Sequence, residues 1–337
     1  MKNVFSDVEK EYQALRSRTG LVDYEGIGLF TVKGEQASSF LNHLTTRSVD
    51  FLLEGQVSNA LLLKDDGTVV AEVLMHCRDD GYLLEVWPAQ AERAGAHLAA
   101  TAAGHDGVTL TDVSDTYRVF GIEGPESFRI AATYLPFPVA SMAYNSFATN
   151  TLDGVELLVS RTGVTGEYGF KVHVPADRAE TLREELLGAG ATEVGLDAIN
   201  VCRMETRFVN LEGESGGAEV NPFDLGLQWM VNPDGDFVGA AALKEAKKSQ
   251  SRRPVCWEST GETATVPAAG SGVTVADRQV GEVSHAVWSP TRGRVIGTAR
   301  IDAAVAASGL EFTVGDIAVR TVSAPFLVAT SFGVTME

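Results

Sequence analysis

The sequence predicts an α+β fold that ends in a separate all-β module, and three observations support this prediction. Strand-like and helical segments follow one another in two similar series along residues 27–208. The only dense basic run, KEAKKSQSRR, changes the composition at residues 244–253, where we expect a solvated helix end and a linker. Beyond it, residues 254–337 contain short strand-like runs separated by turns. We therefore expect two intertwined α+β lobes in residues 1–253 and a barrel-like β-domain in residues 254–337.

The first series begins with a strand over residues 27–33 and a helix over residues 35–46. Three strand-like runs follow, separated by Asp-Gly pairs, which indicate tight turns because glycine adopts the positive φ that such turns need. These runs are Ser58–Leu63, Thr68–Cys77 and Tyr82–Trp87. An alanine-rich helical stretch over residues 88–104 completes the series, with a proline in its first turn.

The second series repeats this order. Strand-like runs cover residues 117–122, 155–159 and 169–174, and a helix is expected from Ala176 to Leu187. Residues 195–208 form a further expected helix. The repeated order indicates two βαβ-type units of mixed α+β character, and it argues against one long parallel sheet.

Composition limits the possible functions. Among 337 residues, 45 are acidic and 27 are Lys or Arg, and the resulting net charge of -18 makes nucleic acid and anionic membranes poor partners. No apolar run approaches the roughly 20 residues that a bilayer requires, and the N-terminus lacks the pattern of a signal peptide. Cys77, Cys202 and Cys256 are far apart and form no C-x-x-C pair, which is typical of the reducing cytosol. We expect a cytoplasmic enzyme that acts on a small molecule.

Common catalytic and metal-binding motifs give little support to other enzyme classes. GESGG at residues 213–217 fits G-x-S-x-G, but a helix end and a loop flank it, whereas a nucleophile elbow requires a strand and a helix. Phosphate-binding and dinucleotide-binding glycine loops are missing. The six histidines show no i, i+4 pair and no Cys/His cluster, so we expect no metal site.

A glycine-rich loop is the first candidate for a ligand contact. Residues 161–169, RTGVTGEYG, carry Glu167 between two expected strands, and glycine allows the backbone to approach a ligand closely. The alternative is a plain hairpin turn with an exposed Glu167.

A buried carboxylate is the second candidate. Glu205 follows Leu196 and Cys202 on the apolar face of the helix over residues 195–208, so it should face inward or toward a cleft. A buried carboxylate must be paired with a cation or bound to a ligand. The alternative to a ligand is an internal pair with Arg203 or Arg207.

Six fragments, taken in order along nearly the whole chain, resemble the aminomethyltransferase family, which comprises the glycine cleavage T-protein and its tetrahydrofolate-dependent relatives. Each fragment is weak alone, but six in the family's order are specific. They are LRSRTGLVD at residues 15–23, TGVTGEYG at 162–169, GLDAINVCRME at 195–205, NPFDLGL at 221–227, DFVG at 236–239 and SPT at 289–291.

This resemblance implies a three-lobed, cloverleaf-like fold whose central hole binds tetrahydrofolate. It implies that Glu205 accepts two hydrogen bonds from the pterin edge and that Glu167 and Tyr168 line the same cavity. Cations such as Arg203 and Arg292 would hold the anionic cofactor, with Arg292 loosely assigned to its glutamate tail.

Trp87 is a departure from the family's pattern, because an amide is usual at its position. Its indole would stack on an aromatic substrate or contact a cationic one, or it would simply pack in the core.

A second departure concerns two adjacent aspartates of the family, the first of which is its central catalytic carboxylate. Ala71 and Glu72 hold these positions here. Neighbours on a strand point to opposite faces, so Glu72 does not simply replace the residue before it. We therefore expect a tetrahydrofolate-dependent methyltransferase or demethylase, which moves a methyl group from a small-molecule S-, O- or N-methyl donor to N5. The candidate proton donors are Tyr24, Glu72, Tyr168 and His285.

Two alternatives remain. One is aminomethyl or hydroxymethyl transfer with 5,10-methylenetetrahydrofolate, as in the T-protein. The other is a non-catalytic, folate-binding accessory protein, although the cysteine-containing motif of the family's iron–sulfur maintenance branch is missing. The sequence does not indicate the oligomeric state.

Overall fold

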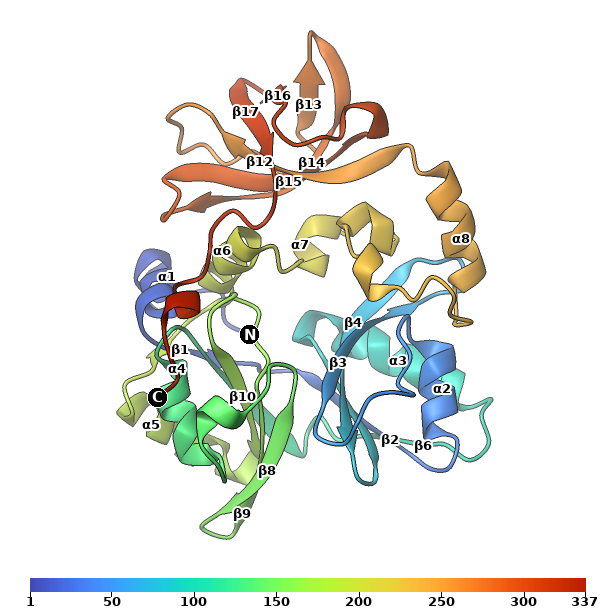
Figure 1. Ribbon diagram of the computed structural model, residues 1–337, viewed down its shortest axis with the longest axis vertical. Coiled ribbons are helices and arrows are strands. Elements are labelled where there is room, and N and C mark those ends of the chain that lie inside the picture. Colours follow the sequence, from blue (N-terminus) through green and yellow to red (C-terminus); the bar gives the residue numbers. More distant parts are fainter.

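Three β-sheets, each at the centre of one lobe, organise the computed structural model, which describes residues 1–337 (Figure 1). An N-terminal lobe, a middle lobe and a barrel surround a short helical segment that contains α6 (Leu196–Thr206) and α7 (Leu211–Ser215). The three-lobed α+β fold with a C-terminal barrel is therefore confirmed. None of the helices combines the length and the apolarity that crossing a membrane requires.

The N-terminal lobe contains a five-stranded sheet in the order β3-β4-β5-β2-β6. Its elements are β2 (Gly28–Lys33), α2 (Ala37–Leu44), β3 (Val57–Leu63), β4 (Val69–Arg78), β5 (Gly81–Val86), α3 (Ala91–Ala102) and β6 (Thr109–Asp112). The two helices cover one face, where Phe40 and Leu98 pack in one core with Val73 and Leu84 of the strands. The opposite face is left to contact the rest of the molecule.

The middle lobe contains a six-stranded sheet in the order β11-β1-β7-β10-β9-β8. Its elements are β1 (Gly20–Asp23), β7 (Tyr117–Glu123), α4 (Ser127–Ala131), β8 (Phe147–Leu152), β9 (Val155–Ser160), β10 (Gly169–Pro175), α5 (Ala179–Gly188) and β11 (Thr192–Glu193). Phe128 of α4 and Leu186 of α5 share a core with Phe170 and Val172 of β10. This face of the sheet is therefore the one that the helices cover.

Both sheets are antiparallel apart from the β1–β11 pair, so the βαβ-type units expected from the sequence are wrong. The Asp-Gly turns explain the difference. Gly67 and Gly81 have positive φ and close hairpins between β3 and β4 and between β4 and β5. A short hairpin joins antiparallel strands only, whereas a parallel pair needs a long crossover.

The helix-free faces of the two sheets pack against each other. Leu29 and Leu83 of the N-terminal sheet share a core with Val119 and Leu158 of the middle sheet. Because side chains alternate along a strand, β10 buries its apolar residues under the helices and turns Lys171 and His173 toward the other sheet.

Two further helices lie outside the three sheets and the helical segment. In α1 (Val8–Ser17), which is not among the expected helices, the side chain of Asp7 caps the N-terminus by accepting a hydrogen bond from Lys10 N at 3.1 Å. The helix α8 (Ala240–Ser249) ends in the basic run and leads to the barrel. The helix α7 follows α6 after a short loop and no strand precedes it, so Ser215 does not occupy a nucleophile elbow.

The C-terminal domain is a closed barrel in the order β12-β15-β14-β13-β16-β17. Its strands are β12 (Arg252–Ser259), β13 (Gly272–Val275), β14 (Arg278–Ser289), β15 (Arg294–Asp302), β16 (Glu311–Val314) and β17 (Ile317–Val322). Trp257 is fully buried in the barrel core. After β17 the chain leaves the barrel and runs beside the middle lobe, where it ends (Figure 1).

Candidate functional site

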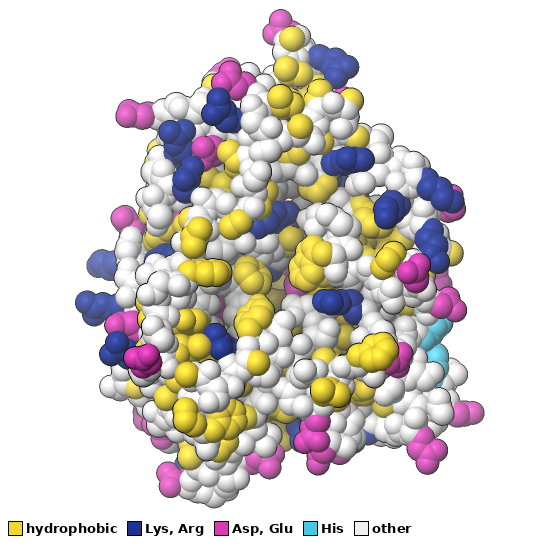
Figure 2. Space-filling model, in the orientation of Figure 1, with side chains coloured by type: hydrophobic (Ala, Val, Ile, Leu, Met, Phe, Trp, Pro, Cys, Tyr) yellow, Lys and Arg dark blue, Asp and Glu magenta, His cyan; other side chains and the backbone are white.

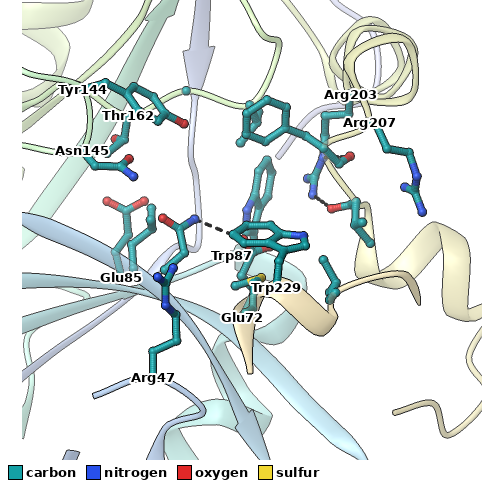
Figure 3. Close-up of a pocket in the computed structure, with 18 of the residues that line it drawn as sticks. Arg47, Glu72, Glu85, Trp87, Tyr144, Asn145, Thr162, Arg203, Arg207 and Trp229 are labelled. Atoms are coloured by element: carbon teal, nitrogen blue, oxygen red, sulfur yellow. Dashed lines mark hydrogen bonds between the residues drawn. The ribbon is translucent and has the colours of Figure 1, made fainter. Parts of the chain in front are cut away.

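A cavity of about 370 Å³ lies where the two sheets meet the helical segment (Figure 3). Its volume is in the range typical of small-molecule sites. The space-filling view shows the molecule hollowed near its centre, with hydrophobic and basic side chains around the hollow (Figure 2). Charged and aromatic residues that line the cavity are Arg47, Glu72, Glu85, Trp87, Tyr144, Lys171, Arg203, Arg207, Phe208 and Trp229.

Glu72 supplies a carboxylate to this cavity from the middle of β4. Its one side-chain hydrogen bond comes from Asn59 Nδ2 at the long distance of 3.5 Å. Ala71 points the other way and is fully buried in the core beneath α2 and α3. Alternation along β4 therefore turns position 72 toward the cavity. Position 71, which the resemblance aligns with the family's catalytic aspartate, packs in the core.

Trp87 and Arg203 form one wall of the cavity. The guanidinium carbon of Arg203 lies 4.5 Å from the centre of the Trp87 ring, within the range of a cation–π contact. Arg203 also donates to the backbone oxygen of Val209, and its burial lowers the pKa of the guanidinium from its ordinary value. Both residues line the cavity, and their expected contacts with a ligand stay predictions.

The glycine-rich loop reaches the cavity through Thr162, Gly163 and Val164. Glu123, fully buried at the end of β7, holds this loop in place. Its Oε2 accepts hydrogen bonds from Val164 N at 3.0 Å, Thr165 N at 2.9 Å and Thr165 Oγ1 at 2.7 Å. The loop is therefore a fixed part of the cavity wall.

Comparison with known proteins gives matches over both parts of the chain. Residues 1–235 match the model of the GCVT N-terminal domain, and residues 252–327 match that of the glycine cleavage T-protein C-terminal barrel domain. The chain belongs to the aminomethyltransferase (T-protein) family.

Curated relatives agree with this assignment. The chain is 32% identical over 316 residues to an aminomethyltransferase of Streptomyces coelicolor, covering 91% of this chain and 84% of the relative. It is 32% identical over 335 residues to one of Anoxybacillus flavithermus, covering 96% and 91%. It is also similar in fold to the crystal structure of aminomethyltransferase T from Bartonella henselae, with a TM-score of 0.85 at 24% identity, over 96% of this chain and 90% of that one.

The aminomethyltransferase family uses tetrahydrofolate, and the cavity lining fits a flat, anionic ligand of this kind. Trp87 and Trp229 offer aromatic surface for a ring system. Arg47 adds a half-buried guanidinium that suits a carboxylate, and Glu72 has acceptor capacity left for ring N–H groups.

Glu205 does not lie in this cavity, in contrast to the role that the family resemblance implies. It is fully buried, and Tyr12, Arg16 and Ser289 all donate hydrogen bonds to its two oxygens. Tyr12 OH lies 2.8 Å from Oε1, and Arg16 Nη2 lies 2.7 Å from Oε2. The ion pair forms with Arg16, which is neither of the two arginines that the sequence suggested.

Glu167 and Tyr168 line a second pocket of about 680 Å³, between the glycine-rich loop and the C-terminal segment. Glu167 is buried, so the exposed hairpin turn is wrong. Its carboxylate accepts from Thr330 N at 3.1 Å and from Ser331 N and Oγ at 2.8 and 2.6 Å, while Tyr168 OH donates to Val334 O. Both residues therefore fasten the C-terminal segment to the middle lobe.

Three other expected site residues do not line the central cavity. Tyr24 is buried beside it, donates to Glu123 Oε1 at 3.3 Å, and has a raised pKa because of its burial. His285 is in β14 of the barrel, packed toward α7. Arg292 lies at the barrel surface and pairs with Glu258 at 2.6 Å. No short sequence pattern distinguishes these positions from cavity positions, because lobe packing decides which face is covered.

Sequence reasoning missed several cavity residues, including Arg47, Tyr144, Trp229, Glu85 and Lys171. They belong to separate loops and strands, so no spacing rule connects them. The Glu85–Lys171 contact joins the two sheets and is almost completely buried. Burial by itself raises the pKa of Glu85, but the Lys171 charge and the neighbouring His173 and His76 together outweigh this effect and hold the pKa well below its usual range.

Proposed function

We propose that this chain transfers a one-carbon unit between an amine-bearing small molecule and tetrahydrofolate, as an aminomethyl-type transferase. The observation that carries the proposal is the Glu72 carboxylate, which lines the central cavity without a strong internal partner. The names of the curated relatives support the same type of reaction. They favour it over the demethylase that we expected from the departures in the sequence.

Tetrahydrofolate supplies the nitrogen atoms that accept the one-carbon unit. In the proposed reaction, the two folate nitrogen atoms each form a bond to the aminomethyl carbon of the donor, and the bonds from that carbon to the amine and to the rest of the donor break. The two N–H protons of tetrahydrofolate leave with these two groups. Glu72 stabilises the positive charge that develops on the carbon and nitrogen, and it passes a proton to the amine, which leaves as ammonia. Trp87 and Arg203 provide a flat wall that orients the reacting rings within the cavity.

Product analysis tests this proposal. The purified chain is incubated with tetrahydrofolate and a panel of aminomethyl, sulfonium and ether donors, and the folate products are separated by chromatography. Formation of 5,10-methylenetetrahydrofolate from an aminomethyl donor, whose carbon is already at the oxidation level of the product, is the expected outcome. A chain that binds no folate, or that binds it and turns over no donor, contradicts the proposal.

A matched pair of variants tests the role of Glu72. We expect Glu72→Gln to lower kcat by about 100-fold or more while folate affinity is kept, because general acid–base groups typically contribute factors of this size. Glu54→Gln is the control, since Glu54 is an exposed glutamate. Equal activity of the two variants would exclude Glu72 as the catalytic carboxylate.

Methyl transfer to N5 is the second candidate, and Trp87 is the observation that favours it. An indole at the cavity wall suits a methylated sulfonium or ammonium donor by cation–π contact. This reaction would yield 5-methyltetrahydrofolate in the same assay, so the product identity decides between the two candidates.

A further inference from the structure

Three metal-ligating side chains meet between the two sheets, outside the part of the cavity that the proposed reaction uses. They are His76 of β4, Glu85 of β5 and His173 of β10. All three are buried, and their ligand atoms lie within 4.8 Å of one another. The site exists only because the helix-free faces of the two lobes pack together.

The polar atoms of this cluster are left without hydrogen bonds. Both ring nitrogens of His76, both of His173 and Oε2 of Glu85 are buried with no hydrogen-bond partner. His173 Nε2 lies 3.2 Å from Glu85 Oε2, which is a polar contact between two members of the cluster. Burying a polar group without a partner is costly, and folded proteins rarely leave several such atoms at one place.

We propose that His76, Glu85 and His173 bind a divalent transition-metal ion, with zinc as the ion that fits best. Two imidazoles and one carboxylate are a common set of three protein ligands for zinc, and they leave a fourth position for water or another small ligand. A bound ion would give a partner to one nitrogen of each histidine and to the free oxygen of Glu85, which are atoms that the fold otherwise leaves unsatisfied.

Lys171 determines which oxygen of Glu85 can bind the proposed metal ion. Its ammonium contacts Oε1, so Oε2 remains on the side of the two histidines. Such an outer contact orients a ligating carboxylate, as second-shell partners do in other metal sites. Lys171 also repels a cation, so the carboxylate is shared between the ammonium and the metal ion.

A further pocket borders the cluster. His173 lines a separate pocket of about 380 Å³, which Lys33, Arg78 and Glu156 also border. Glu85 lines the central cavity on the other side (Figure 3). The proposed ion would therefore lie in the wall between the two pockets. The proposal does not depend on which one-carbon unit the chain transfers.

Zinc titration of the full, untagged chain tests the proposal. The protein is freed of metal by a chelator and titrated with zinc chloride in a calorimeter. We expect the wild type to bind one equivalent per chain and the His76→Phe and His173→Phe variants to lose that equivalent. His97→Phe is the matched control and should keep it, because His97 Nε2 is also buried without a partner but belongs to α3, outside the cluster.

A second measurement keeps the test decisive if a buried substitution unfolds the chain. Zinc should raise the Tm of the wild type and of His97→Phe, because an ion that binds only the folded state stabilises it. Cobalt in place of zinc should give visible absorption bands in the wild type. A wild type that binds no zinc, or a zinc equivalent that persists in both cluster variants, overturns the proposal.

Discussion

Arg16 donates two hydrogen bonds to the same oxygen of Glu205, from Nε at 3.0 Å and from Nη2 at 2.7 Å. Its remaining Nη1 donates to Thr165 O and to Glu167 Oε1. One buried guanidinium therefore ties α1 to α6 and to the glycine-rich loop, and Glu205 belongs to this structural network.

Removing Glu205 should destabilise the fold. We expect Glu205→Ala to lower the free energy of unfolding by about 3–5 kcal/mol, because it leaves the buried charge of Arg16 without its main partner. Urea denaturation measures the loss. Glu245→Ala is the control, since its ion pair with Lys248 is exposed and should contribute less than about 1 kcal/mol. Similar small losses in both variants would contradict the structural role of Glu205.

The C-terminal segment should loosen when Ser331 loses its hydroxyl. This hydroxyl donates to Glu167 Oε2 at 2.6 Å and accepts from Tyr168 N at 2.9 Å. In Ser331→Ala, we expect faster hydrogen exchange of the backbone amides of residues 327–334. Thr330→Ala is the control because the Thr330 side chain is exposed. Unchanged exchange in Ser331→Ala would show that other contacts hold the segment.

The Trp87 ring, which forms one wall of the cavity together with Arg203, should contribute to folate binding. We expect Trp87→Ala to weaken tetrahydrofolate binding by about 3- to 30-fold, the range of one partly desolvated cation–π contact. Trp87→Phe keeps an aromatic face and should lose much less. Calorimetric titration measures the tetrahydrofolate affinity of both variants relative to the wild type. Equal affinities of the alanine and phenylalanine variants would show that the aromatic ring at position 87 does not contribute to binding.

His285 should make the protein less stable in acid. Burial lowers its pKa from the ordinary value of 6.5, so the folded state keeps the ring neutral. The unfolded chain takes up the proton below about pH 6.5, and stability therefore falls as the pH decreases through this region, by up to ~1.4 kcal/mol per pH unit. His285→Gln should reduce the difference between unfolding free energies measured at pH 7.5 and pH 5.5. An unchanged difference would assign the acid sensitivity to other groups.

Local patterns predicted most of the elements that the chain forms. The helix expected over residues 35–46 is α2, and the runs bounded by Asp-Gly turns are β3, β4 and β5. The basic run at residues 244–253 marks the passage from α8 to the barrel. These features depend on side-chain periodicity and on the φ preference of glycine, which act within a few residues and can therefore be read from the sequence.

Only the tertiary structure decided which polar side chains meet. The sequence by itself determined the family, the α+β class of the lobes and the inward direction of Glu205. It assigned the Glu205 carboxylate to a ligand, whereas in the structure Arg16, 189 residues away along the chain, binds it. It likewise indicated no metal site, because His76 and His173 lie on different sheets. The Arg16–Glu205 contact depends on how α1 packs against α6. The approach of His76 to His173 depends on how two sheet faces pack and which register each strand adopts, and a change of one residue in register would turn either histidine to the opposite face.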